Sequence, residues 1–195
     1  MYSRSMLNRF SEINTKVNAI DIERLAIEIS DLKKTGGRLF ILGVGGSAAN
    51  ASHAVNDFRK LCGIQAYCPT DNVSELTAIV NDSKDGWKLF FANWLSENKL
   101  NSNDILLILS VGGGSLEDKI SENLVVASEV AKIAGLKVLA ILGRDGGEVG
   151  KIADYKVIIP NLFPTYVTPI VEGIQSVILH ILVTNPILQE NETTW

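Results

Sequence analysis

The sequence predicts an open, doubly wound α/β fold, with a five-stranded, mostly parallel sheet flanked by helices and preceded by N-terminal helices. Two observations support this prediction. Several short runs are apolar at nearly every position, which is typical of parallel strands covered on both faces. Segments with helical spacing of apolar residues lie between these runs. Sheets of this kind bind ligands beyond the carboxyl ends of their strands.

The first 35 residues are predicted to be helical. Apolar residues recur there at helical spacing, and they are Ile20, Ile22, Leu25, Ile27, Ile29 and Leu32. The pair Gly36 and Gly37 ends this helical stretch. A chain of 195 residues suits one compact domain, so we expect 1–195 to form a single domain with its α/β core in 36–195.

Each predicted strand is a short apolar run. The runs cover 38–42, 105–109, 137–142 and 156–159, with a weaker candidate at 64–68. Helical patterns between them cover 48–61, 87–98 and 117–133. A final helix is expected from Pro169 to Thr184, since proline suits a first turn and Asn185-Pro186 ends the pattern. This helix is apolar nearly all round, which predicts burial, here against a second subunit.

Composition and charge exclude several classes of protein. The net charge of −4 and the lack of a basic stripe argue against nucleic acid as a partner. The N-terminus does not read as a secretory signal, and no uncharged apolar run is long enough for a membrane span. The two cysteines, Cys62 and Cys68, are expected to be reduced thiols of a cytoplasmic protein.

A glycine-rich loop follows the first strand. It consists of Gly43, Val44, Gly45, Gly46 and Ser47. Glycines let the backbone turn sharply and approach a ligand, and the helix that follows presents an N-terminus that attracts anions. Alternatively, the loop is a tight turn in which Ser47 is the N-cap. It matches neither the Walker loop nor the dinucleotide fingerprint, so no nucleotide cofactor is expected.

Two further strands end in glycine-rich loops. The second loop consists of Ser110, Val111, Gly112, Gly113, Gly114 and Ser115, and Ser115 is placed to cap a helix beginning near Leu116. A capped turn without a ligand is the alternative. Because both loops follow strands of one sheet, we expect them to face the same crevice. The third loop, 143–147, is predicted to be a structural turn without a catalytic role.

The chain has only two histidines, His53 and His180. Asp57 lies four residues after His53, on the same helical face. His180 lies in the apolar final helix, where it needs a polar partner. Each histidine is either a satisfied core residue or a general acid/base. Glu172 precedes His180 by eight residues, about 12 Å along a helix, so both serve one site only if different subunits contribute them.

Together, these loops, the pair Asn81-Asp82 and His180 occur in an order that resembles the sugar isomerase (SIS) domain family, and within it the phosphoheptose isomerases. The resemblance spans nearly the whole chain. It implies a cytoplasmic homotetramer whose active sites lie between subunits. It further implies that a phosphorylated sugar is held by positions that include Gly45, Gly46, Ser47, Asp82, Ser110, Val111, Gly112, Ser115 and Glu172.

The same resemblance implies the catalytic positions. His180 matches the family's catalytic histidine, and Asp57 stands where the family has a glutamate. Glu172 stands in place of a glutamine and is a further catalytic candidate. Some members carry zinc, and the matching ligand positions are His53, Asp57, Glu172 and His180.

The loops depart from the family pattern. Val44 replaces an asparagine, and Val111, Gly112 and Gly114 replace polar residues, so we expect backbone N–H groups to take over from lost hydroxyls.

The resemblance implies aldose–ketose isomerisation through an enediol, converting sedoheptulose 7-phosphate to a heptose 7-phosphate for lipopolysaccharide or capsule biosynthesis. Asp57 and His180 are the candidate base and acid. The alternative is a non-catalytic SIS protein, related to a tetrameric adaptor that binds the replication initiator. A phosphosugar-sensing regulator usually needs an attached DNA-binding domain, for which 195 residues leave no room.

Overall fold

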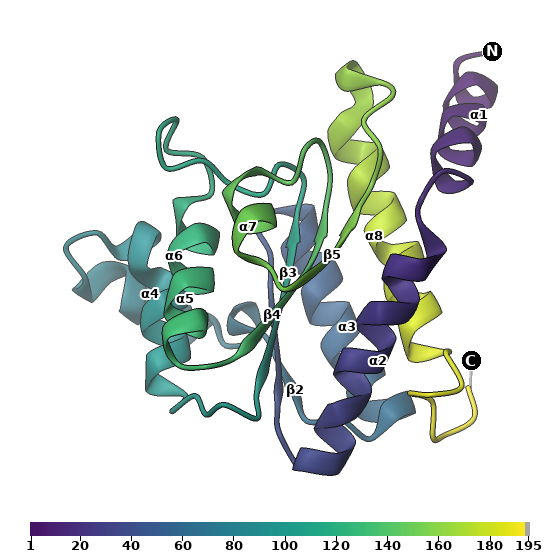
Figure 1. Ribbon diagram of the computed structural model, residues 1–195. Helices are drawn as coiled ribbons and strands as arrows, with labels where there is room; N and C mark the ends of the chain where they lie inside the picture. Colours follow the sequence, from purple (N-terminus) through teal and green to yellow (C-terminus); the bar gives the residue numbers. More distant parts are fainter. Residues whose placement is uncertain (194–195) are drawn as a thin grey trace.

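The computed structural model describes residues 1–193, and within them a five-stranded sheet carries helices on both faces (Figure 1). The strands are β1 (Leu39–Leu42), β2 (Ala66–Tyr67), β3 (Ile105–Ser110), β4 (Lys137–Leu142) and β5 (Tyr155–Ile158). All neighbouring strands pair in parallel. The predicted fold class is therefore confirmed, and the weaker strand candidate at 64–68 forms the short β2.

The strand order β2-β1-β3-β4-β5 places a topological switch point between β1 and β3. The chain leaves β1 toward one edge of the sheet and leaves β3 toward the other. A crevice opens at such a point beyond the carboxyl ends of the two strands, and ligands of doubly wound proteins bind there. The loops 43–47 and 110–115 follow these two strands, so both flank the crevice as expected.

Strand side chains alternate between two cores. Leu39 and Ile41 face the core formed with α2 (Ala19–Thr35), α3 (Gly46–Cys62) and α8 (Val167–Val183). Phe40 and Leu42 face the opposite core. That core is completed by α4 (Val73–Asp82), α5 (Gly86–Glu97), α6 (Glu122–Ile133) and α7 (Gly147–Ile152). Burial on both faces explains why the strands read as continuous apolar runs.

The predicted N-terminal helical region consists of two helices, α1 (Tyr2–Asn14) and α2. Asn18 separates them, and its side chain caps α2 by accepting a hydrogen bond from the Ile20 N–H at 3.1 Å. Gly36 ends α2 in the left-handed conformation, at φ +69°, as the glycine pair predicted. α1 extends past the rest of the fold beside the start of α8 (Figure 1).

The final helix was expected from Pro169 to Thr184, and α8 spans Val167–Val183. With the short turn before it, the segment Pro164–Val183 is long and apolar enough to cross a membrane. Half of the segment is buried inside the fold, where it packs against α3, and such burial is typical of a core helix. Val177 and Ile181 remain 42% and 41% exposed, so burial on all sides within the chain is not observed.

Two expectations about helices were wrong. The helix predicted for 117–133 begins at Glu122, because residues 115–121 form a loop in which the backbones of Ser115 and Ile120 bond to each other. Ser115 therefore does not cap a helix near Leu116. In addition, α4 and α7 were not predicted. α7 begins at Gly147, at the end of the loop expected to be only a turn.

Candidate active site

The site residues expected from the sequence fall mainly into two regions, and α3 connects them. One region comprises the strand-end loops 43–47 and 110–115. The other is a cluster of His53, Asp57 and His180, which we call the histidine cluster. α3 begins in the first loop and carries His53 and Asp57 two to three turns further along.

The histidine cluster brings three titratable side chains into contact. His53 Nε2 lies 3.2 Å from Asp57 Oδ2 and 3.2 Å from His180 Nε2. His180 Nε2 lies 3.8 Å from the same carboxylate oxygen. Asp57 is buried, whereas the side chains of His53 and His180 are 50% and 39% exposed. The buried carboxylate thus holds two imidazoles that remain open to solvent on one side.

Hydrogen bonds restrict the protonation of His180. Its Nδ1 lies 2.8 Å from the carbonyl oxygen of Ser176, and a carbonyl only accepts, so Nδ1 carries a proton. In the neutral ring, Nε2 then presents a lone pair to the cluster. Asp57 Oδ1 accepts a hydrogen bond from Asn56 Nδ2 at 3.0 Å, which fixes the carboxylate. Nε2 is therefore the His180 atom that is available to accept a proton or to bind a metal.

The histidine cluster also has the geometry of a zinc site. Histidine nitrogen and carboxylate oxygen bind zinc at about 2.0–2.2 Å, so two ligands of a tetrahedral site lie about 3.4 Å apart. The three separations of 3.2, 3.2 and 3.8 Å match this value. The Ser176 carbonyl would orient the His180 ring in the manner of metal-ligating histidines. Within residues 1–193, Glu172 is not part of this group, so three of the four expected ligands come together.

Glu172 instead lies at the start of α3. Its carboxylate packs closely against Gly46, and a Cβ there would overlap with Glu172 Oε2, so a side chain at this position would displace the end of Glu172. Its backbone oxygen accepts a hydrogen bond from Asn50 Nδ2 at 2.9 Å. A carboxylate at a helix N-terminus is favourable for the helix, but it occupies the position at which an anion would otherwise bind.

The first loop differs from expectation at Ser47. Gly45, with φ +64°, is the N-cap of α3, so the reading of Ser47 as N-cap was wrong. Ser47 is buried, and its hydroxyl donates a hydrogen bond to Gln175 Oε1 at 2.9 Å. This hydroxyl ties α3 to α8 within the chain.

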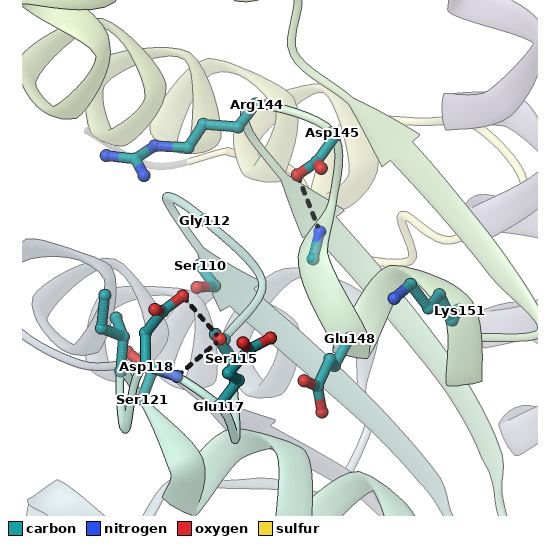
Figure 2. A pocket seen from close by; sticks show the side chains of 13 residues that line it. Ser110, Gly112, Ser115, Glu117, Asp118, Ser121, Arg144, Asp145, Glu148 and Lys151 are labelled. Carbon is teal, nitrogen blue, oxygen red and sulfur yellow. Dashed lines mark hydrogen bonds between the residues drawn. The ribbon is translucent and has the colours of Figure 1, made fainter.

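The second loop also uses its hydroxyls internally. Ser110 Oγ accepts a hydrogen bond from the Gly113 N–H at 3.0 Å. Ser115 Oγ donates to Asp118 at 2.9 Å and accepts from the Asp118 N–H at 3.1 Å (Figure 2). Gly113 adopts φ +72° and packs against the Gly146 backbone, where a Cβ would not fit. The loop shape therefore depends on glycine, and its serines hold the turn.

Two cavities adjoin the second loop. One of about 340 Å³ lies between this loop and the start of α7 (Figure 2). Another of about 260 Å³ lies between the first and second loops at the switch point. The residues that line the second cavity are Val44, Ser110, Val111, Gly112, Ile120, Ser121, Arg144 and Thr168. None of the three cluster residues lines either cavity.

Asp82 is not brought together with the other site residues. It is exposed at the end of α4, on the face of the sheet opposite α3 and α8 (Figure 1), and accepts a hydrogen bond from Asn81 Nδ2 at 2.9 Å. Within one chain, its predicted contact with a sugar is therefore separated from the histidine cluster.

Sequence reasoning missed three residues that position the site. They are Asn50, Gln175 and Ser176. Gln175 gave a usable signal, because it is a polar residue on the apolar face of α8 and therefore needs a partner.

The cysteines take no part in either region. Both are free and buried. Burial raises the pKa of the Cys62 thiol to about 11 and also raises the pKa of Cys68. Thiols of this kind stay protonated near neutral pH and are poor nucleophiles.

Comparison with known proteins agrees with the resemblance seen in the sequence. The family model described as SIS domain matches residues 1–143. A phosphoheptose isomerase of Akkermansia muciniphila is 33% identical over 146 residues, which cover 72% of each chain. The lincomycin biosynthesis protein LmbN of Streptomyces lincolnensis is 33% identical over 78% of this chain, which spans 56% of that protein. The structure of a phosphoheptose isomerase from Francisella tularensis superposes with a TM-score of 0.80 at 22% identity, covering 93% of this chain and 94% of that one.

Proposed function

The chain belongs to the SIS domain family, and from that premise we propose that it is a phosphosugar isomerase that interconverts an aldose and a ketose. The observation that carries the proposal is the contact of Asp57 with His180 and His53. Isomerisation needs a group that removes a proton beside a carbonyl and a group that returns one to the neighbouring carbon. A buried carboxylate beside a half-exposed imidazole supplies both.

In the proposed reaction, Asp57 removes a proton from C1 of the ketose while the C2 oxygen is protonated, which gives the enediol. The O1 hydroxyl then loses its proton as C2 gains one, which gives the aldose. His180 delivers the C2 proton through Nε2, because Ser176 holds the other ring proton on Nδ1. His53, within hydrogen-bond distance of both, keeps the two groups aligned. If His53, Asp57 and His180 instead held a zinc ion, the metal would occupy the atoms that exchange protons in this reaction and would polarise the carbonyl as a Lewis acid in place of that exchange.

We propose that neighbouring subunits of a homotetramer share each site. Within one chain, the cavity at the switch point and the histidine cluster are lined by different residues. The cluster is open to solvent, and Val177 and Ile181 are exposed beside His180 on α8. A second subunit that covered this face would bring its own strand-end loops or Asp82 toward the cluster.

The substrate we propose is sedoheptulose 7-phosphate, converted in the cytoplasm to a heptose 7-phosphate for surface polysaccharide assembly. The names of several relatives support this choice. The test is to incubate the purified protein with sedoheptulose 7-phosphate and to measure aldose by NMR. Turnover is expected in the wild-type protein and a loss of at least about 100-fold in His180→Ala, with the circular dichroism spectrum unchanged.

Ile133→Ala, a change at an exposed residue of α6, serves as the control and should retain activity. Full turnover by His180→Ala would contradict the assigned role. If the wild-type protein binds the sugar phosphate without converting it, the non-catalytic SIS protein becomes the better account. The internal bonding of Ser47, Ser110 and Ser115 is the observation that keeps this second candidate open.

A further inference from the structure

Arg144 combines three unusual properties at the end of β4. It is exposed, and its backbone adopts φ +53°, a conformation that most side chains avoid. Within residues 1–193 its guanidinium forms no hydrogen bond or ion pair. Its side chain extends across the second loop, away from Asp145 (Figure 2). A Cβ on Gly112 would lie 3.7 Å from Arg144 Cδ and 3.9 Å from Nε.

The strained backbone of Arg144 calls for a compensating interaction. A left-handed conformation costs an ordinary side chain on the order of 1 kcal/mol, and glycine or asparagine would avoid most of that cost. No partner for the guanidinium within residues 1–193 offsets the strain. An arginine at this position is therefore better explained by a ligand than by the stability of the chain.

The charges that line the two cavities differ in sign. In the larger cavity, Arg144 and Lys151 face four carboxylates, those of Glu117, Asp118, Asp145 and Glu148. These acids would repel a phosphate. In the cavity at the switch point, Arg144 is the only charged residue in the lining. An anion is therefore favoured at the switch point and disfavoured in the larger cavity.

The second loop offers a backbone donor beside the same guanidinium. Its serine hydroxyls already bond within the loop. By contrast, the N–H of Gly112, which lines the cavity at the switch point, forms no hydrogen bond within residues 1–193. A free backbone N–H in a glycine turn can donate a hydrogen bond to an anion. A phosphate in the cavity at the switch point would meet the Gly112 N–H on one side and Arg144 on the other.

We propose that Arg144 binds the phosphate group of the substrate in the cavity between the first and second loops. The proposal rests on the function proposed above only for the identity of the ligand as a sugar phosphate. Arginine suits this task because its planar guanidinium donates two parallel hydrogen bonds to phosphate oxygens. From the third loop it supplies a charge beside the second loop, in which valine and glycine leave few side-chain donors.

The test compares Arg144→Asn with Lys151→Gln. Asparagine tolerates the left-handed backbone, so the first change removes the charge without adding strain. Lys151 lines only the acidic cavity of the two, so its variant removes a cation that the proposal does not use. Inorganic phosphate is titrated into each full-length protein by calorimetry, and KM and kcat are measured with sedoheptulose 7-phosphate.

Arg144→Asn is expected to weaken phosphate binding about 10- to 100-fold and to raise KM by a similar factor, with kcat little changed. Lys151→Gln should behave as the wild-type protein, and Arg144→Lys should recover part of the affinity. Wild-type phosphate affinity in Arg144→Asn, or no phosphate binding by the wild-type protein, would overturn the proposal.

The two proposals fail separately. If phosphate binding depends on Arg144 but no aldose forms, the isomerase function fails and the Arg144 site stands. If the wild-type protein isomerises the sugar and Arg144→Asn leaves KM and phosphate affinity unchanged, the Arg144 site fails and the function stands.

Discussion

The strand-end loops and the histidine cluster lie at different levels of α3 and are built in opposite ways. In the loops, the hydroxyls of Ser47, Ser110 and Ser115 bond within the chain and hold a fixed backbone shape. In the cluster, Asp57, His53 and His180 bond mainly to one another, and the two imidazoles face solvent. The loops thus have side chains committed to the shape of the backbone, whereas the cluster presents side chains whose chemistry suits proton exchange or metal binding.

This division predicts that substitutions in the two regions change different kinetic constants. Changes in the loops should act on binding and therefore on KM. Changes in the cluster should act on the chemical step and therefore on kcat. Each experiment below would either sharpen this difference or remove it.

The largest effect is expected from Asp57→Asn. The amide cannot accept the substrate proton, so kcat should fall by about 100- to 10,000-fold while KM changes little. Steady-state kinetics with sedoheptulose 7-phosphate measure both constants. Glu117→Gln, which removes an exposed acid near the second loop, is the control and should retain kcat. An equal loss in both variants would mean that the cluster is not the seat of the chemistry.

A smaller effect is expected from zinc binding, and it concerns the stability of the protein. A site formed by the histidine cluster should raise the free energy of unfolding by about 2.7 kcal/mol when free zinc is 100-fold above its Kd. His53→Gln should abolish this gain, because it removes one of three ligands. Glu172→Gln should keep it, since Glu172 lies against Gly46 rather than in the cluster.

Urea unfolding with and without zinc gives the comparison. If Glu172→Gln removes the gain as completely as His53→Gln does, the four-ligand site expected from the sequence is the correct one.

The smallest effect is expected from Glu172→Gln in the absence of zinc. Loss of the carboxylate at the start of α3 should lower the free energy of unfolding by about 0.3–1 kcal/mol. The same change should strengthen the binding of inorganic phosphate a few-fold, because a negative charge leaves the first loop. A lower free energy of unfolding in urea, together with tighter phosphate binding in calorimetric titration, would support a role of Glu172 at the start of α3. A large fall in kcat would instead assign Glu172 to the chemistry.

The fold was more predictable than the site. Strand positions followed from local apolar runs, and the pairing of His53 with Asp57 followed from their spacing of four residues. The contact of Ser47 with Gln175 joins residues 128 positions apart, and no local pattern carries it. No local pattern predicts the contact of Glu172 with Gly46 or that of Arg144 with Gly112 either.

Ser115 shows why local patterns also mislead. A serine before acidic residues is typical of a helix N-cap. Here its hydroxyl bonds to Asp118 within a turn, and the chain does not become helical until Glu122. The antiparallel bridge between Ser115 and Ile120, together with Ser121 at φ +48°, delays the helix.

The central claim is that the histidine cluster exchanges the protons of an enediol reaction. It is tested most directly by NMR of sedoheptulose 7-phosphate incubated with the protein in D2O. The wild-type protein should give an aldose that carries solvent deuterium at C2, and His180→Ala should give none. An aldose that carries only protium at C2, or one that His180→Ala forms at the wild-type rate, would contradict the claim.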